Sequence, residues 1–439
     1  MSIAIITLLL FSALVGALVV GVPIAFATGA VAVVFGVWLF DFNTLNLVVS
    51  RVFTLMGNQI LVSVPLFILM ATILEKAGIA EDIFKAAYIW SGKLRGGLAV
   101  AVVISCALMA AMVGVIGAEI VTMGVVALPA MLKRGYQKSL ALGSICAGGG
   151  LATLIPPSVV LIMYALVAGT SIGQLYMAGI FPGLMLAGMY ILYIIIVSYF
   201  KPEIAPSAPP EELNISLSQK LGYLRNLILP SLVAASVLGS LYFGWATPTE
   251  AAGIGVVGAL VAALVNRRFT WSHLFSAVVD TTKVTCMLYW LFFGASALIG
   301  IYTLAGGTQY LKELISGLPI GRWGILIVIN LIWIVLGCLI DWIGILLLTG
   351  PIFIPVAVAL GFDPIWLGVL FCMNMQISYI SPPFGPAMFY LKGCAPPEIS
   401  MGDIVRSVWP FIGIQVVALG VVMAFPQIAL WLPQTMIAR

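Results

Sequence analysis

The chain has 439 residues, of which 63% are hydrophobic and only 8% are charged. Soluble domains carry about 25% charged residues, so this composition excludes a soluble protein and predicts an all-α polytopic membrane protein. The net charge of +4 does not indicate nucleic-acid binding, because the basic residues stand between apolar runs. Residues 1–20 lack the basic start of a secretory signal, and we interpret them as the first spanning helix.

Apolar runs recur through the first half of the chain and give its expected elements. Spanning helices are expected over residues 3–20, 23–40, 61–74 and 175–199. The other expected elements are an amphipathic segment at 45–58, a basic loop after residue 74, an apolar hairpin at about 98–132 with its tip at 114–119, and a broken helix at about 139–165. A polar, proline-rich linker at 201–225 ends this half.

The second half repeats this plan. Its expected elements are spanning helices at 226–243, 250–265, 269–304 and 404–432, a hairpin at about 324–360 with its tip at 337–342, and a broken helix at about 365–391. Residues recur at a constant offset of 226: Pro129, Gly135, Cys146, Pro156 and Pro157 match Pro355, Gly361, Cys372, Pro382 and Pro383. We therefore divide the chain into two repeats, 1–200 and 226–439, with about ten spanning helices and two re-entrant hairpins.

The distribution of basic residues predicts the orientation. With the N-terminus outside and each hairpin returning to its own side, 15 of the 19 basic residues lie inside. The four outside are Arg51, Lys312, Arg322 and Arg439. The positive-inside rule favours this topology, which places the linker inside and the C-terminus outside. One half then starts outside and the other inside, so the repeats are inverted.

Charge alone does not decide whether each hairpin is re-entrant or a pair of full spans. Legs of about 13–16 residues rise only about 20–24 Å, which is less than the hydrocarbon core of about 30 Å. This length favours re-entrant hairpins, less strongly for the longer second leg of the second hairpin.

Two stretches place helix breakers at membrane depth, at residues 148–158 (GGGLATLIPPS) and 375–385 (MQISYISPPFG). Proline removes a backbone donor, and glycine weakens a helix. In hydrocarbon such breaks persist only where protein or a water-filled cavity satisfies the freed backbone groups. Broken helices at matching positions of two halves indicate the binding site of a secondary transporter.

Glu119 and Asp341 are the acids well inside the apolar regions, one at each hairpin tip. An intramembrane carboxylate is costly and indicates function, although a protonated packing residue or a tip that reaches water is the alternative. Tip carbonyls at Gly114, Gly117 and Gly337 can turn toward a common point, so we predict sodium sites there.

Hydroxyl groups in the breaks, at Thr153, Ser158, Ser378 and Ser381, are further candidate ligands. The half-helices that start after each Pro-Pro pair present positive dipole ends suited to a substrate carboxylate. For any single hydroxyl, a hydrogen bond to its own helix is the alternative. Arg51 is a candidate for binding an anionic substrate, with an interfacial anchor as the alternative.

Enzymatic function is not expected. His273 is the sole histidine, and the chain lacks a GxxxxGK[ST] motif, so we expect neither a histidine metal site nor ATP hydrolysis. A nucleophile–base pair is not apparent. We expect no cofactor, and we expect Na⁺ to act as the coupling ion.

Several motifs resemble the large membrane subunit of tripartite ATP-independent periplasmic (TRAP) transporters. They are GVIGAEIVTMG (114–124), LPAM (128–131), IPPS (155–158), DWIG (341–344), PPFGPAMFYLKG (382–393), GVPIAF (21–26) and TPTEAA (247–252). The resemblance covers essentially the whole chain. It is nearest to the branch linked with keto acids, aromatic acids and mannitol or chloroaromatic compounds.

The resemblance implies a sodium-driven, elevator-type importer in a bacterial inner membrane. Combined with the orientation predicted from the basic residues, this would make both termini periplasmic. The resemblance implies two protein partners: a separate small four-helix membrane subunit and a periplasmic binding protein that delivers the organic anion. Family sodium and substrate sites map onto 114–119, which includes Val115, and onto 153–158, 337–341 and 378–381. Gly150 is a further candidate sodium ligand. Family members often carry a small hydroxyl residue where this chain has Glu119, which leaves the role of Glu119 open.

Sodium bound at the tips would order both hairpins and complete a midplane site for an organic anion. The loaded hairpins and broken helices would then slide past a frame built from residues 3–74 and 226–304. The main alternative is a stand-alone sodium/dicarboxylate symporter. A channel or a non-transporting membrane scaffold is a more distant one.

Overall fold

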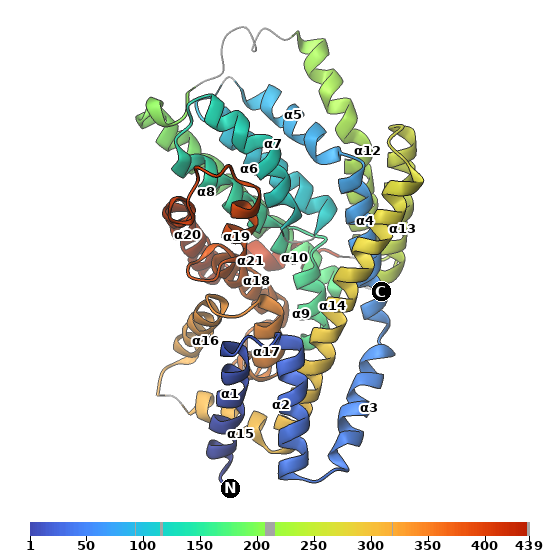
Figure 1. Ribbon diagram of the computed structural model, residues 1–439, viewed down its shortest axis with the longest axis vertical. Helices are drawn as coiled ribbons and strands as arrows, with labels where there is room; N and C mark the ends of the chain where they lie inside the picture. Colours follow the sequence, from blue (N-terminus) through green and yellow to red (C-terminus); the bar gives the residue numbers. More distant parts are fainter. Residues whose placement is uncertain (93, 115–116, 207–215, 318, 437–439) are drawn as a thin grey trace.

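A computed structural model describes residues 1–92, 94–114, 117–206, 216–317 and 319–436, and every element assigned in them is a helix (Figure 1). The first half contains α1 (Ile3–Val19), α2 (Ile24–Leu39), α3 (Thr44–Met56), α4 (Gln59–Lys76), α5 (Ile79–Ser91), α6 (Gly97–Val113), α7 (Ala118–Lys133), α8 (Lys138–Gly150), η1 (Leu151–Thr153), α9 (Val159–Ala168), α10 (Ile172–Phe200) and η2 (Pro202–Ile204). The second half contains α12 (Leu217–Tyr242), α13 (Pro248–Val265), α14 (Trp271–Leu304), α15 (Gly307–Ser316), α16 (Arg322–Gly337), α17 (Trp342–Ala359), α18 (Pro364–Ile380), α19 (Pro386–Cys394), α20 (Met401–Ala424) and α21 (Gln427–Gln434).

Six of the described helices are long and apolar enough to cross a bilayer, namely α4, α10, α13, α14, α17 and α20. The bent helix α12 makes a seventh if its two parts form one span. Helices α1 and α2 have only 17 and 16 residues, and the two broken helices are each divided into shorter pieces. The protein therefore has the multi-pass helical architecture that the sequence predicted. The predicted number of about ten spanning helices remains a prediction.

One group of helices, which we call the frame group, consists of α2, α4, α13 and α14. Helix α4 packs along α13 and α14, and α2 packs along α14. The crossing of α2 and α14 is close because it contains glycine: a Cβ on Gly294 would overlap Thr28 Oγ1 and lie 3.2 Å from the Gly29 amide nitrogen. Small residues at such crossings let helix backbones approach closely in a membrane protein.

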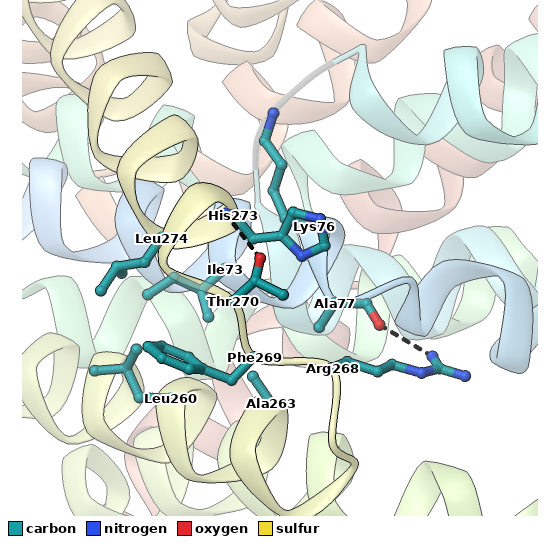
Figure 2. A pocket seen from close by; sticks show the side chains of 10 residues that line it. All are labelled: Ile73, Lys76, Ala77, Leu260, Ala263, Arg268, Phe269, Thr270, His273 and Leu274. Carbon is teal, nitrogen blue, oxygen red and sulfur yellow. Dashed lines mark hydrogen bonds between the residues drawn. The ribbon is translucent and has the colours of Figure 1, made fainter.

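A side-chain clamp joins the end of α4 to the turn between α13 and α14, where a small crevice is found (Figure 2). The Arg268 guanidinium donates to the carbonyl oxygens of Ala77 and Gly78, each at 3.0 Å, and pairs with Asp82 at 2.8 Å. Carbonyls at a helix end lack intrahelical donors, so this arginine satisfies two of them. The sole histidine, His273, lines the same crevice, and the crevice is too small to hold a substrate.

A second group of helices, which we call the hairpin group, consists of α6–α9 and α16–α20. Within it α8 packs on α6, α7 and α20, while α18 packs on α16 and α20. Buried rings in contact hold α9, α16 and α18 together: Phe371 lies 5.1 Å from Trp333 in an edge-to-face pair and 5.9 Å from Tyr164 in a tilted pair, centroid to centroid. This aromatic core fixes the two broken helices relative to each other.

The structure differs from expectation in the connections. The basic loop expected after residue 74 is mostly the amphipathic helix α5, whose apolar residues Ile79, Ile83, Phe84 and Ala87 face the core. Helix α12 begins at Leu217, not at residue 226, because Ser216 and Gln219 form a capping box ahead of it. The expected linker is thus shortened to residues 201–216, of which 207–215 lie outside the described residues.

The last expected helix, over residues 404–432, is two helices. Helix α20 ends at Ala424 and α21 starts at Gln427, with Pro426 at its N-terminal boundary. Proline cannot donate to the preceding turn, so the chain restarts there.

Candidate functional site

Both broken helices are interrupted in the hairpin group. Helix α8 ends at Gly150 and continues as the short helix η1 to Thr153, and a new helix, α9, begins at Val159. Helix α18 ends at Ile380 and resumes with α19 at Pro386. The Pro156–Pro157 and Pro382–Pro383 peptide bonds are both cis. Each gap leaves backbone groups free of the helical ladder; residues 154–158 of the first gap are all buried, whereas only Ser381 and Gly385 are buried in the second.

Each hairpin tip rests on the break of its own half. A Cβ on Gly114, at the end of α6, would overlap the Pro157 carbonyl oxygen, and Gly114 has φ +56°. A Cβ on Gly337, at the end of α16, would overlap the Ser378 side chain. Only glycine allows these two approaches, and Gly114 also adopts a backbone conformation that other residues rarely take. The candidate sodium residues on tips and breaks are therefore close neighbours.

The first tip also reaches into the second half of the chain. A Cβ on Gly117, which has φ +103°, would lie 3.0 Å from the ring of Tyr390 in α19. Across the two breaks, the Gln376 amide of α18 donates to the Gly150 carbonyl of α8 at 2.8 Å. These contacts bring both tips and both breaks into one region.

Glu119, at the start of α7, is fully buried, and neither of its carboxyl oxygens has a hydrogen-bond partner in the described part of the chain. Leaving an ionised carboxylate buried and unpaired costs several kcal/mol. Glu119 therefore needs either a proton or a cation. Glu119 lies next to the first hairpin tip, which is the position expected from the sequence.

Asp341 caps α17 at the second tip. Its Oδ2 accepts from the Ile343 amide at 3.4 Å, and the residue is partly exposed. One carboxyl oxygen is thus occupied weakly, and the residue lines the cavity described below. An N-terminal helix position favours the charged form of this acid.

The four break hydroxyls all donate back to their own chain segments. Thr153 donates to Gly150 O at 2.9 Å and Ser158 to Thr153 O at 2.7 Å, while Ser378 and Ser381 donate to Asn374 O and Ile377 O at 2.9 and 2.6 Å. This is the alternative that the sequence left open. A hydroxyl that donates in this way keeps its oxygen lone pairs, so it can still accept a cation. The Gly150 carbonyl already accepts two hydrogen bonds, which makes it a poorer ligand.

A cavity of about 770 Å³ separates the two helix groups at this point. The hairpin group contributes Gly114, Asp341, Tyr379 and Tyr390 to its wall, and the frame group contributes apolar residues of α2, α4 and α14, among them Trp290. A volume of this size suits a small organic molecule. The second tip, with its acid, thus borders a ligand-sized space.

Other predicted residues lie away from this cavity. Arg51 is exposed on α3 and packs against Gly300 of α14, whose Cβ would lie 3.4 Å from the arginine Nε. It is not among the described residues that line the cavity, so this conformation favours the anchor interpretation of Arg51. Val115 lies outside the described residues.

The sequence did not predict several polar residues of α18 and α19 as part of the candidate site. Asn374 and Gln376 are fully buried, and each keeps a side-chain oxygen without a partner in the described chain. Tyr379 and Tyr390 line the cavity as a tilted pair with ring centroids 6.5 Å apart. The signal for the amides was their presence in an apolar run, where polar side chains are costly.

Comparison with known proteins gives the family. Residues 11–428 match the family model described as "Tripartite ATP-independent periplasmic transporter, DctM component". The chain is 31% identical over 446 residues to the C4-dicarboxylate TRAP transporter large permease protein DctM of Vibrio cholerae, covering 97% of each chain. It is 29% identical over 428 residues to the ectoine TRAP transporter large permease protein TeaC of Halomonas elongata, covering 97% of this chain and 98% of that one.

A solved structure shares the fold. The YdaH transporter of Alcanivorax borkumensis superposes with a TM-score of 0.60 at 16% identity, covering 92% of this chain and 98% of that one. The chain thus shares the overall helical fold of that protein. By its family match, this chain belongs to the DctM large permease family of tripartite ATP-independent periplasmic transporters, and it is a transport component, not an enzyme.

Proposed function

We propose that the chain imports an organic anion by sodium-coupled, elevator-type movement. One observation carries the proposal: an acid at a hairpin tip, Asp341, borders a ligand-sized cavity lined by helices of both the frame group and the hairpin group. A carboxylate substrate placed beside Asp341 would be repelled by it. A cation between the two carboxylates removes this repulsion and lowers the cost of burying both.

We propose sodium sites on the two tips and their breaks. The proposed ligands are tip carbonyls and acids with the break hydroxyls: Gly114, Gly117, Glu119, Gly150, Thr153, Gly337, Asp341, Ser378 and Ser381. Hard cations prefer such oxygen ligands, and unwound backbone next to helix ends supplies them. The two unpartnered oxygens of Glu119 support a site at the first tip, because a bound cation would satisfy them.

The substrate site is proposed at the same breaks, with Val115, Thr153, Ser158, Asp341 and Ser381 as its residues. Both half-helix starts reach the cavity: Val159, the first residue of α9, lines it, as do Phe384 and Pro386 at the start of α19. The backbone N–H groups at this helix start suit a carboxylate. Arg51 would contribute only from another conformation, because it packs on α3 and α14 here.

The two helix groups supply the parts of an elevator. The hairpin group would carry the site, and the frame group would remain fixed in the membrane. The Arg268 clamp joins the end of α4 to the turn between α13 and α14 within the frame group. We also propose that the chain consists of two inverted repeats. Gly150 and Gln376, which are 226 positions apart, contact each other directly, as residues near a pseudo-two-fold axis would.

The relatives carry different solutes by name, C4-dicarboxylates and ectoine, so the family does not fix the substrate. We propose the keto acid and aromatic acid branch. Apolar and aromatic side chains dominate the cavity wall, including Phe26, Trp290 and Phe384. Such a wall favours an anion with an apolar body.

The family is one component of a tripartite system, which implies two further components. We propose a small four-helix membrane subunit as a separate polypeptide and a periplasmic protein that delivers the anion. The location would be a bacterial inner membrane, with both termini periplasmic and residues 201–216 cytoplasmic.

Uptake into proteoliposomes tests this proposal. Vesicles with the permease and its small subunit should accumulate a labelled keto acid only with an inward sodium gradient and the binding protein outside. Accumulation without the binding protein would favour the stand-alone symporter. Failure with a full panel of carboxylates would contradict transport of organic anions.

A further inference from the structure

A surface groove lies between the last turns of α10 and the first turns of α8 and α20. Its volume is about 300 Å³, and none of the described residues that line it lines the cavity at the hairpin tips. Exposed side chains, among them Ile196, Phe200 and Pro410, form part of its wall, so the groove opens to the outside of the protein. Helices α10 and α20 are both long and apolar enough to span a bilayer, and such helices present their exposed apolar side chains to lipid.

The groove changes from apolar to charged along α10. Tyr193 and Val197 line it within the spanning helix, and Lys201 lines it directly after the helix ends at Phe200. Eight residues of α-helix rise about 12 Å, so the lysine lies about that far from Tyr193 along the helix axis. A lipid whose acyl chain lies along the apolar part would therefore place its headgroup near the lysine.

Two contacts make the groove a fixed feature of the fold. Tyr193 of α10 and Phe411 of α20 form an edge-to-face pair with ring centroids 5.3 Å apart. At the other end the chain folds back after α10, and the Gln137 amide at the start of α8 donates to the Ile204 carbonyl oxygen at 2.9 Å. All four residues line the groove, so its wall is joined both within the membrane-spanning part and at its polar end.

The charge of the groove suits an anion. Lys201 is the only charged residue among the described residues that line it, and it is exposed. Two more basic residues, Lys138 and Arg406, are next in sequence to lining residues of α8 and α20. The nearest acids in sequence, Glu203 and Asp403, do not line the groove, and Asp403 is engaged in the capping box of α20. Basic pockets between spanning helices at the cytoplasmic side are suited to anionic lipid headgroups.

We propose that this groove binds a phospholipid with an anionic headgroup, with one acyl chain against Tyr193 and Val197 and the phosphate beside Lys201. The orientation predicted from the basic residues places this end of α10 at the cytoplasmic side, so the lipid belongs to the cytoplasmic leaflet. The apolar stem of a lysine can lie along such a groove while its ammonium group reaches the headgroup. The site does not depend on which solute or coupling ion the protein uses.

Lipid titration of the purified full-length permease in detergent, followed by native mass spectrometry, tests the site. The probes are phosphatidylglycerol and phosphatidylcholine with identical acyl chains, added to the permease alone and to its complex with the small subunit. We expect the first phosphatidylglycerol to bind at least about fivefold more tightly than the first phosphatidylcholine. Equal affinities for the two lipids would overturn the proposal.

A charge substitution addresses the headgroup. Lys201→Gln should weaken phosphatidylglycerol binding about fivefold and leave phosphatidylcholine binding unchanged, because it removes one positive charge. Lys85→Gln is the matched control, since Lys85 is an exposed lysine of α5 that does not line the groove. An unchanged lipid preference in Lys201→Gln, or an equal loss in Lys85→Gln, would overturn the assignment of the headgroup.

A bulky substitution addresses the acyl chain. Val197→Trp should fill the groove and weaken the binding of both lipids. Leu192→Trp is the matched control, because Leu192 is an exposed residue of the same helix that does not line the groove. Equal lipid binding by these two variants would overturn the groove as the place of the acyl chain.

Two further outcomes concern the occupant. Glycerol 1-phosphate carries the phosphate without acyl chains and should not displace phosphatidylglycerol; displacement at equal concentrations would reveal a site for free phosphates and overturn the lipid assignment. Loss of the lipid preference on adding the small subunit would make the groove a contact of that subunit and also overturn it. The comparison of lipids on the wild type needs no variant, so it decides even where a variant fails to fold.

Discussion

The seat of the first hairpin tip is the contact most sensitive to a single added carbon. Gly114 has φ +56°, and a Cβ there would overlap the Pro157 carbonyl oxygen and lie 3.0 Å from its carbonyl carbon. The left-handed conformation alone costs a non-glycine residue about 1–2 kcal/mol. Because the clashing atom is backbone, it cannot rotate away, and the tip must lift from the break.

Gly114→Ala should therefore shift the equilibrium of tip closure by at least about 5–30-fold, which is the 1–2 kcal/mol expressed as a ratio. If sodium binds only to the seated tip, the sodium concentration for half-maximal uptake rises by the same factor. The assay is sodium-dependent uptake into proteoliposomes at several sodium concentrations.

Gly169→Ala is the matched control for this experiment. Gly169, at the end of α9, has φ +64°, and nothing lies within 4 Å of its Cβ position. It carries the same backbone strain without the overlap, so it should lower stability and leave the sodium dependence unchanged. Wild-type sodium dependence in Gly114→Ala, or an equal effect in Gly169→Ala, would refute the role of the seated tip.

Three further predictions concern charged residues. Asp341→Asn should abolish sodium-dependent uptake with normal expression, because it removes the charge that we propose binds the ion; uptake at the wild-type rate would exclude Asp341 from the site. Glu119→Gln should raise the half-saturating sodium concentration about tenfold or more, measured by uptake, whereas the exposed Glu313→Gln should not. Arg268→Ala should lower the free energy of unfolding by only about 1 kcal/mol, because its ion pair is partly exposed; thermal melting of the purified protein measures this, with Arg267→Ala as the control.

Much of the helical framework could be predicted from apolar periodicity and from proline. Runs of about 20 apolar residues need a helix in a membrane, whatever their packing, so most helix positions followed directly. The prediction of a loop after residue 74 was wrong. Basic residues such as Lys85 are typical of a membrane-side loop, but Ile79, Ile83 and Phe84 have the spacing of one face of an amphipathic helix. The start of α12 carried a capping signal at Ser216 that its polar surroundings obscured.

Some residues of the candidate site could likewise be predicted from the sequence, and others could not. Acids in apolar segments are rare and costly, so Glu119 and Asp341 could be chosen from sequence alone. Tyr379 could not, because an aromatic residue in an apolar helix is most often core. Only packing reveals that its hydroxyl is buried without a partner in the described chain and that other atoms of the residue border a cavity. Arg51 illustrates the reverse case, since its charge suggested a role that its position on α3 does not support.

The central claim is that sodium drives import of an organic anion delivered by a binding protein. It is tested most directly by uptake of a labelled keto acid into proteoliposomes that hold the permease and its small subunit. We predict accumulation only when an inward sodium gradient and the external binding protein are both present. Equal accumulation with the sodium gradient abolished would contradict the account.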